Sequence, residues 1–136
     1  MSMANNLSIF DISGRAMAAQ LVRLNTTASN LANAGTISGS EGTAFRAMKP
    51  VFRTVMGEAG KATVKVDRID TATTVPVKRY EPNHPLADKD GNIWEAAVDS
   101  AAEMVEMLET SRQYQNNVQV LSTAKGLISE TLRLGQ

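Results

Sequence analysis

The 136-residue chain contains no cysteine and few aromatic side chains. The absence of Cys excludes a disulfide framework, a thiolate nucleophile and a Cys-based metal site. Aromatic residues make up only 4% of the chain, whereas compact cores usually depend on several large rings. The seven Met residues are well suited to contacts between helices. The composition therefore favours packed helices over a globular core built around rings.

The chain also lacks a surplus of charge, because 14 basic residues balance 14 acidic ones. Binding to nucleic-acid phosphates needs a basic surplus, so we expect no nucleic-acid partner. No run of about 18 apolar residues is present, so we expect no direct membrane span. The N-terminal segment has neither a basic stretch nor a long apolar stretch, so we expect no cleaved signal peptide.

Residues able to support catalysis or metal binding are equally sparse. His84 is the single histidine and stands in a Pro-flanked segment that is typical of an exposed loop. Residues 88–92 resemble part of a calcium loop, but the glycine is misplaced for one. Glu103, Glu106 and Glu109 follow one helix face, and a solvated face explains them better than a metal site. We therefore predict no enzyme activity, no cofactor and no metal.

A heptad-like pattern is present at each end of the chain. Residues step by alternating threes and fours, which predicts one helix over residues 7–33 and a second over residues 98–134. Asp99 is the expected N-cap of the second helix. We predict that the following residues form helix seams at an assembly interface: Leu7, Phe10, Met17, Leu21, Leu24, Leu31, Met104, Met107, Tyr114, Val118, Leu121, Ile128 and Leu132.

The middle of the chain has no such seam. Strand candidates lie at residues 45–55, 63–69 and 75–80, and the last two are expected to form a hairpin. The predicted fold class is mainly α, with two long terminal helices in a coiled-coil-like antiparallel pair and a small β-hairpin or irregular middle. Residues 1–34 and 95–136 are expected to form one helical domain, with residues 35–94 as a loop and β-rich insertion.

The two helices carry more apolar residues than one pair can bury. Val22, Val105, Leu108 and Leu127 lie off the main seams. At about 25 cal/mol per Å² of buried apolar surface, such side chains favour association by some kcal/mol. This indicates a subunit of a larger assembly; the alternative is a non-enzymatic adaptor that presents a helical hairpin to a single partner protein.

The sequence S-N-L-A-N stands near the end of the first predicted helix, at Ser29, Asn30, Leu31, Ala32 and Asn33. It resembles the N-terminal signature of the flagellar rod and hook proteins. Residues 45–47, 80–88 and 131–136, together with the chain length, resemble the proximal-rod members of that family more than the longer distal-rod or hook members.

This resemblance implies a structural subunit of the bacterial flagellar basal-body proximal rod, the helical drive shaft that transmits torque. It implies self-association and contacts with other proximal and distal rod proteins, with the adaptor joining the rod to the basal ring, and with the flagellar type III export apparatus. It places the assembled protein in the periplasmic rod, after export without a cleaved signal. The family brings no catalytic residues to this sequence.

We expect the isolated chain to be incompletely helical or aggregated at micromolar concentration, because its surplus apolar positions need neighbours to cover them. Circular dichroism over a concentration series measures this as helicity that rises on assembly. A strongly helical monomer that melts cooperatively at low concentration would contradict the expectation.

Overall fold

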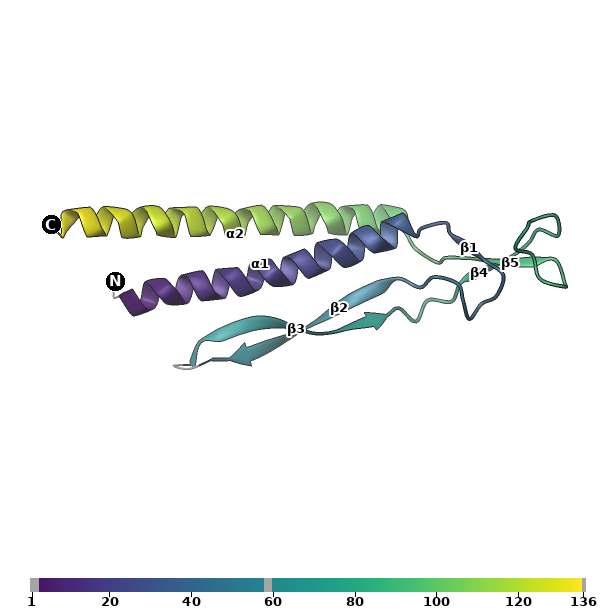
Figure 1. Cartoon of the computed structure of the whole chain (residues 1–136), viewed down its shortest axis with the longest axis horizontal. Coiled ribbons are helices and arrows are strands. Elements are labelled where there is room, and N and C mark those ends of the chain that lie inside the picture. The colour runs from purple at the N-terminus through teal and green to yellow at the C-terminus, as the bar shows by residue number, and fades with distance from the viewer. Residues whose placement is uncertain (1–2, 58–59, 136) are drawn as a thin grey trace.

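The computed structural model describes residues 3–57 and 60–135, with side chains described from residue 8 onward within those ranges. α1 lies between α2 and a β-hairpin, and the start of α1 and the end of α2 lie at the same end of the molecule (Figure 1). In chain order the elements are α1 (Met3–Ala32), β1 (Ile37–Ser38), β2 (Met48–Met56), β3 (Ala62–Thr71), β4 (Val77–Tyr80), β5 (Asn92–Glu95) and α2 (Ser100–Leu134).

The two terminal helices form where the heptad-like spacing predicts them, and they run in opposite directions (Figure 1). Asp99 is the N-cap of α2, and its carboxylate accepts hydrogen bonds from the backbone N–H groups of Ala101 and Ala102, each at 3.1 Å. Arg133 lies in the last turn of α2, where a cation stabilises the negative end of the helix dipole. Helical residues make up 48% of the chain, so "mainly α" overstates the helical share.

The strands form two antiparallel sheets, and the predicted hairpin between residues 63–69 and 75–80 is wrong. β3 pairs with β2 through nine residue pairs, with a bulge between Val51 and Phe52, and β4 pairs with β5 through four. The physical reason is that β2 and β3 are long and almost equal, so joining them satisfies more backbone groups than joining β3 to the short β4. Pro50 is tolerated because β2 has only one neighbouring strand in its sheet.

The sequence did not predict β1 and β5. β5 is the central strand of the three-stranded sheet, with the order β1-β5-β4, and it carries Ile93, whose side chain is fully buried. β1 and β5 are only two and four residues long. β1 is too short to show a pattern, and the sequence Asn-Ile-Trp-Glu of β5 does not alternate between apolar and polar residues.

The structure buries little apolar volume. The chain exposes 9193 Å², whereas a compact monomer of the same mass exposes roughly 6,900 Å². Most of the buried apolar residues in the described part are alanines, and two of the three largest fully buried side chains there, Asn30 and Thr110, are polar. Polar contacts therefore carry much of the internal packing.

Gly91 provides a test of the turn that leads into β5. Its φ is +76°, and a Cβ at this position would lie 2.9 Å from Pro82 Cβ and 2.9 Å from an atom of the Tyr80 ring. We predict that Gly91→Ala lowers the free energy of unfolding by about 1–3 kcal/mol, because the left-handed backbone is strained for an L side chain. Gly126→Ala is the matched control: it lies inside α2 with nothing within 4 Å, so it should raise stability by about 0.5–1 kcal/mol. Denaturant titration measures both, and equal effects would refute this account.

Candidate assembly surfaces

The two helices contact each other through polar side chains, which we call the polar seam. On each helix the spacing is three, four and three residues, so all members lie on one face. The polar seam consists of Gln20, Arg23, Thr27 and Asn30 on α1 and Glu103, Glu106, Thr110 and Gln113 on α2.

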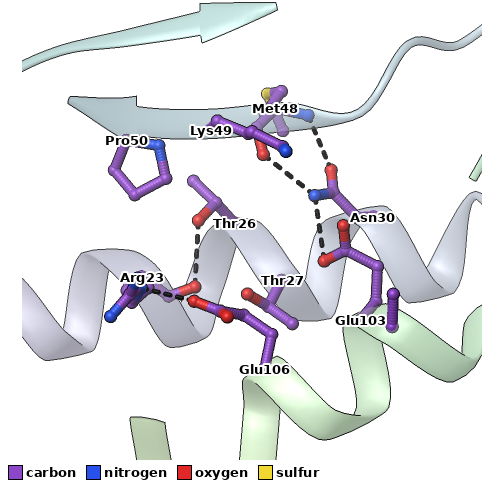
Figure 2. A pocket seen from close by; sticks show the side chains of 10 residues that line it. Arg23, Thr26, Thr27, Asn30, Met48, Lys49, Pro50, Glu103 and Glu106 are labelled. Atoms are coloured by element: carbon purple, nitrogen blue, oxygen red, sulfur yellow. Dashed lines mark hydrogen bonds and ion pairs between the residues drawn. The ribbon is translucent and has the colours of Figure 1, made fainter. Parts of the chain in front are cut away.

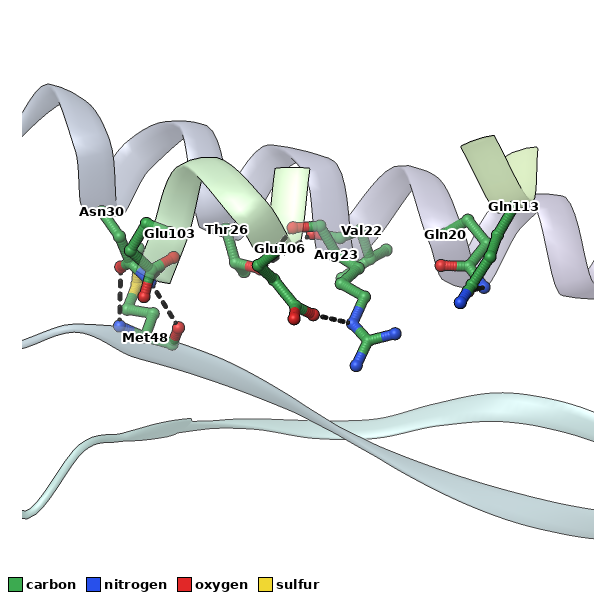
Figure 3. A network of polar contacts seen from close by, with 9 residues as sticks. All are labelled: Gln20, Val22, Arg23, Thr26, Asn30, Met48, Glu103, Glu106 and Gln113. Atoms are coloured by element: carbon green, nitrogen blue, oxygen red, sulfur yellow. Dashed lines mark hydrogen bonds and ion pairs between the residues drawn. The ribbon is translucent and has the colours of Figure 1, made fainter. Parts of the chain in front are cut away.

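Three pairs along this seam join α1 to α2 (Figure 3). Gln20 Nε2 donates to Gln113 Oε1 at 2.8 Å. Arg23 Nε forms an ion pair with Glu106. Asn30 Nδ2 donates to Glu103 Oε2 at 3.2 Å. The order of these pairs fixes the antiparallel register of the helices.

The polar seam is not fully satisfied. Thr110 is fully buried, and neither its Oγ1 nor the buried Gln20 Oε1 has a hydrogen-bond partner within the described part of the chain. A buried acceptor or hydroxyl without a partner costs about 1–3 kcal/mol. The seam therefore specifies how the helices face each other more than it contributes net stability.

Asn30 connects both helices to the β-hairpin (Figure 2). The Met48 N–H donates to Asn30 Oδ1 at 2.8 Å, and Asn30 Nδ2 donates to the Met48 carbonyl oxygen at 2.9 Å. The Asn30 amide thus binds both polar groups of one residue at the start of β2, as a neighbouring strand would. Because Asn30 is only 2% exposed, water cannot replace these bonds readily.

The rest of the S-N-L-A-N segment ends α1. Asn33 donates to the Ser29 carbonyl oxygen through its backbone N–H at 3.1 Å and its side-chain Nδ2 at 2.8 Å. Leu31 is half-buried and Ala32 is exposed. Gly35 follows with φ +77°, the left-handed conformation expected beyond a helix end.

A cavity of about 270 Å³ adjoins the polar seam between α1, β2 and the start of α2 (Figure 2). Its charges balance, since Arg23 and Lys49 oppose Glu103 and Glu106. The Arg23 guanidinium also lies 5.8 Å from the centre of the Phe52 ring, within range of a cation–π contact. On the hairpin, the hydrogen bond from Arg68 to Asp70 raises the pKa of the Arg68 guanidinium above its ordinary value.

Over residues 3–57 and 60–135, no group of three or more His, Asp or Glu side chains is arranged to hold a metal ion. Within the same residues neither helix has a stretch long and apolar enough to cross a membrane.

The predicted seam residues lie beside the polar seam. Six of the thirteen predicted positions are one residue C-terminal to a polar-seam position, as Leu21 is to Gln20, and this corresponds to a rotation of about 100° around the helix axis. Phe10, Met17, Leu24, Leu31, Met107, Tyr114, Leu121 and Ile128 are half-buried, whereas Leu21, Met104, Val118 and Leu132 are exposed. The side chain of Leu7 lies outside the described residues.

Other exposed apolar side chains extend these faces. Val105, Leu108 and Leu127 are 64%, 70% and 57% exposed on α2. Large apolar side chains exposed along two long helices are unusual for a monomer, and this makes the two faces candidates for contact with other proteins.

Sequence reasoning identified Asn30 only as part of a motif, without its contacts. The polar seam was missed although its three-four-three spacing is visible in the sequence, because a heptad search weights apolar residues alone.

Two protein families match this chain at its two ends. The family described as "Flagella basal body rod protein" matches residues 10–36, and "Flagellar basal body rod FlgEFG protein C-terminal" matches residues 89–134. The matches cover most of α1 and all of α2. They define the class of the protein as a flagellar rod protein.

Similar proteins specify the class further. The chain is 46% identical to the flagellar basal-body rod protein FlgC of Salmonella typhimurium, over 96% of this chain and 98% of the relative. The same figures hold for FlgC of Escherichia coli O6:H1, and FlgC of Buchnera aphidicola from Schizaphis graminum is 36% identical over the same shares. The chain belongs to the FlgC family of flagellar basal-body rod proteins.

Asn30→Ala tests the junction at Met48. We predict a loss of about 2–4 kcal/mol in the free energy of unfolding, because the substitution removes the partners of two peptide groups and of Glu103. Asn25→Ala is the matched control, since Asn25 is exposed on the same helix and should change stability by less than about 0.5 kcal/mol. Denaturant titration compares the two, and hydrogen exchange at the Met48 amide should accelerate only in Asn30→Ala. Equal losses in both variants would contradict the assignment.

Proposed function

We propose that this rod subunit is built into the wall of the proximal rod and transmits torque through contacts of its terminal helices with neighbouring subunits. The observation that carries the proposal is the set of exposed apolar residues on both helices, together with a surface well above that of a compact monomer. Such faces are costly in water and become favourable once neighbours cover them.

The proposal also assigns a separate role to each part of the chain. Residues 1–34 and 95–136 act as the helical rod-core domain, in which α1 and α2 form a coiled-coil-like pair. Residues 35–94 act as an insertion that contacts the surroundings of the core. The seam residues from Leu7 to Leu31 and from Met104 to Leu132 serve as the assembly interface, and the heptad-like spacing of both sets supports this assignment.

The proposed partners are other proximal and distal rod proteins, the adaptor between the rod and the basal ring, and further copies of the chain. We propose that the flagellar type III apparatus exports it without a cleaved signal and that it functions in the periplasm. Its role is structural and not enzymatic. These points rest on membership of the rod family.

Substitutions on the exposed seam test the proposal. Val118 and Leu132 are 43% and 54% exposed, so Val118→Asp and Leu132→Asp should change the free energy of unfolding by no more than about 0.5–1 kcal/mol. In a strain lacking the native gene, both variants should fail to enter isolated basal bodies and should fail to restore swimming. Ser122→Asp is the matched control, because it adds the same charge at an exposed polar position of α2 and should leave assembly intact.

Two outcomes would count against the proposal. If Val118→Asp and Leu132→Asp enter basal bodies as well as Ser122→Asp does, the predicted seam is not part of the assembly interface. A deletion strain that still builds a complete rod and swims would remove the rod function and favour the adaptor alternative.

A further inference from the structure

An open apolar groove of about 280 Å³ lies between α1 and β3. The α1 side is made of small or short side chains, so the helix backbone is close to the groove. The apolar lining consists of Ala18, Ala19, Val22, Val64 and Val66.

The rim of this groove carries an ordered set of charges. Lys65 lines it from β3 and Arg15 from α1. Arg15 Nε lies 3.2 Å from Asp11 Oδ1, one helical turn earlier, and both side chains are about half exposed. Along α1 an acidic residue therefore precedes the basic residue that lines the groove, because Asp11 lies one turn before Arg15, just beyond the lining.

A second surface of the chain has the complementary shape. Val105 and Leu108 project from α2 with 64% and 70% exposure, followed by Glu109 and Arg112 one turn on. We call these four residues the outer ridge. Val105, Leu108 and Arg112 lie on the side of α2 that faces away from the polar seam, and Glu109 is exposed at the edge of that side, so the ridge is open to another molecule.

Charge fixes the direction in which the ridge fits the groove. Along α2 the ridge likewise has an acidic residue, Glu109, followed by a basic residue, Arg112. In an antiparallel alignment Glu109 meets Arg15 and Lys65 while Arg112 meets Asp11, whereas a parallel alignment brings like charges together. With Glu109 beside Arg15, the preceding turn of the ridge places Val105 over Ala18 and Ala19, with Leu108 next to it on the side of Arg15.

We propose that the groove between α1 and β3 receives the outer ridge of α2 from a second copy of this chain, in antiparallel orientation. The inference rests on the proposed function and names one contact within it. Because groove and ridge are different surfaces, the contact is heterologous: each copy offers a free groove and a free ridge, and repetition generates a ring or a helical array.

The absence of cysteine allows a direct test with single-thiol variants. Ala18→Cys marks the groove and Val105→Cys marks the ridge, and Cys packs like a small apolar residue at both. The two purified full-length variants are mixed with a short thiol cross-linker over rising protein concentration. We expect the mixed dimer to form about tenfold faster than a control mixture with Ser122→Cys, which lies about 25 Å along α2 from Val105.

Paired charge reversals then test the direction of docking. Asp11→Arg combined with Arg15→Asp keeps the pair within the helix but reverses its order, and should reduce cross-linking several-fold. Glu109→Arg combined with Arg112→Glu on the ridge partner should restore it. Both double variants keep the net charge of the chain, so a general charge effect cannot explain the rescue.

Cross-linking at the rate of the Ser122→Cys control, in the purified mixture and in basal bodies from cells making both variants, would overturn the proposed contact. The proposed contact would also be overturned if the charge reversal on α1 reduces cross-linking and the charge reversal on the ridge does not restore it. Neither result touches the proposed function, which fails if a deletion strain still builds a complete rod and swims.

Discussion

Asn30 joins three elements of the chain through a single side-chain amide. It binds both peptide groups of Met48 and also donates to Glu103, so α1, α2 and β2 meet at one buried residue. An amide offers a donor and an acceptor in nearly the geometry of a peptide group, and therefore α1 can act as a strand neighbour at this point. This junction fixes where β2 begins beside α1, and the contact of Arg23 with the Phe52 ring gives the hairpin a second point of attachment.

The polar seam explains how the helices can pair and still keep apolar faces for other molecules. In an ordinary antiparallel pair the largest apolar side chains point inward. Here Gln20, Arg23 and Asn30 occupy that position on α1, and the apolar stripe lies about one residue further around each helix. The pairing is specific because each polar side chain needs its own partner, and it is weak because much of the gain only replaces hydrogen bonds to water.

Sequence reasoning predicted the helices well and their rotation poorly. The spacing of apolar residues fixes where α1 and α2 form, and Asp99 marks the start of α2, since both are local signals. Which face of one helix packs against the other depends on side chains from both helices. A search for the spacing of apolar residues does not detect the polar seam. The predicted pairing of residues 63–69 with residues 75–80 was wrong for the same reason, because strand partners are set by competition between segments along the chain. Asn30 was found through family resemblance, but its bond to Met48 could come only from the structure.

The large exposed surface of the chain has a consequence for the temperature dependence of the rod. The heat-capacity change of unfolding scales with the apolar surface that becomes exposed, so a chain that buries little apolar surface on its own has a small one. In the proposed assembly the missing part of the heat-capacity change appears when subunits join and their apolar faces leave water. The free energy of the contacts between subunits is then more sensitive to cooling than the free energy of folding of each subunit. On cooling, a rod built in this way weakens first at the contacts between its subunits.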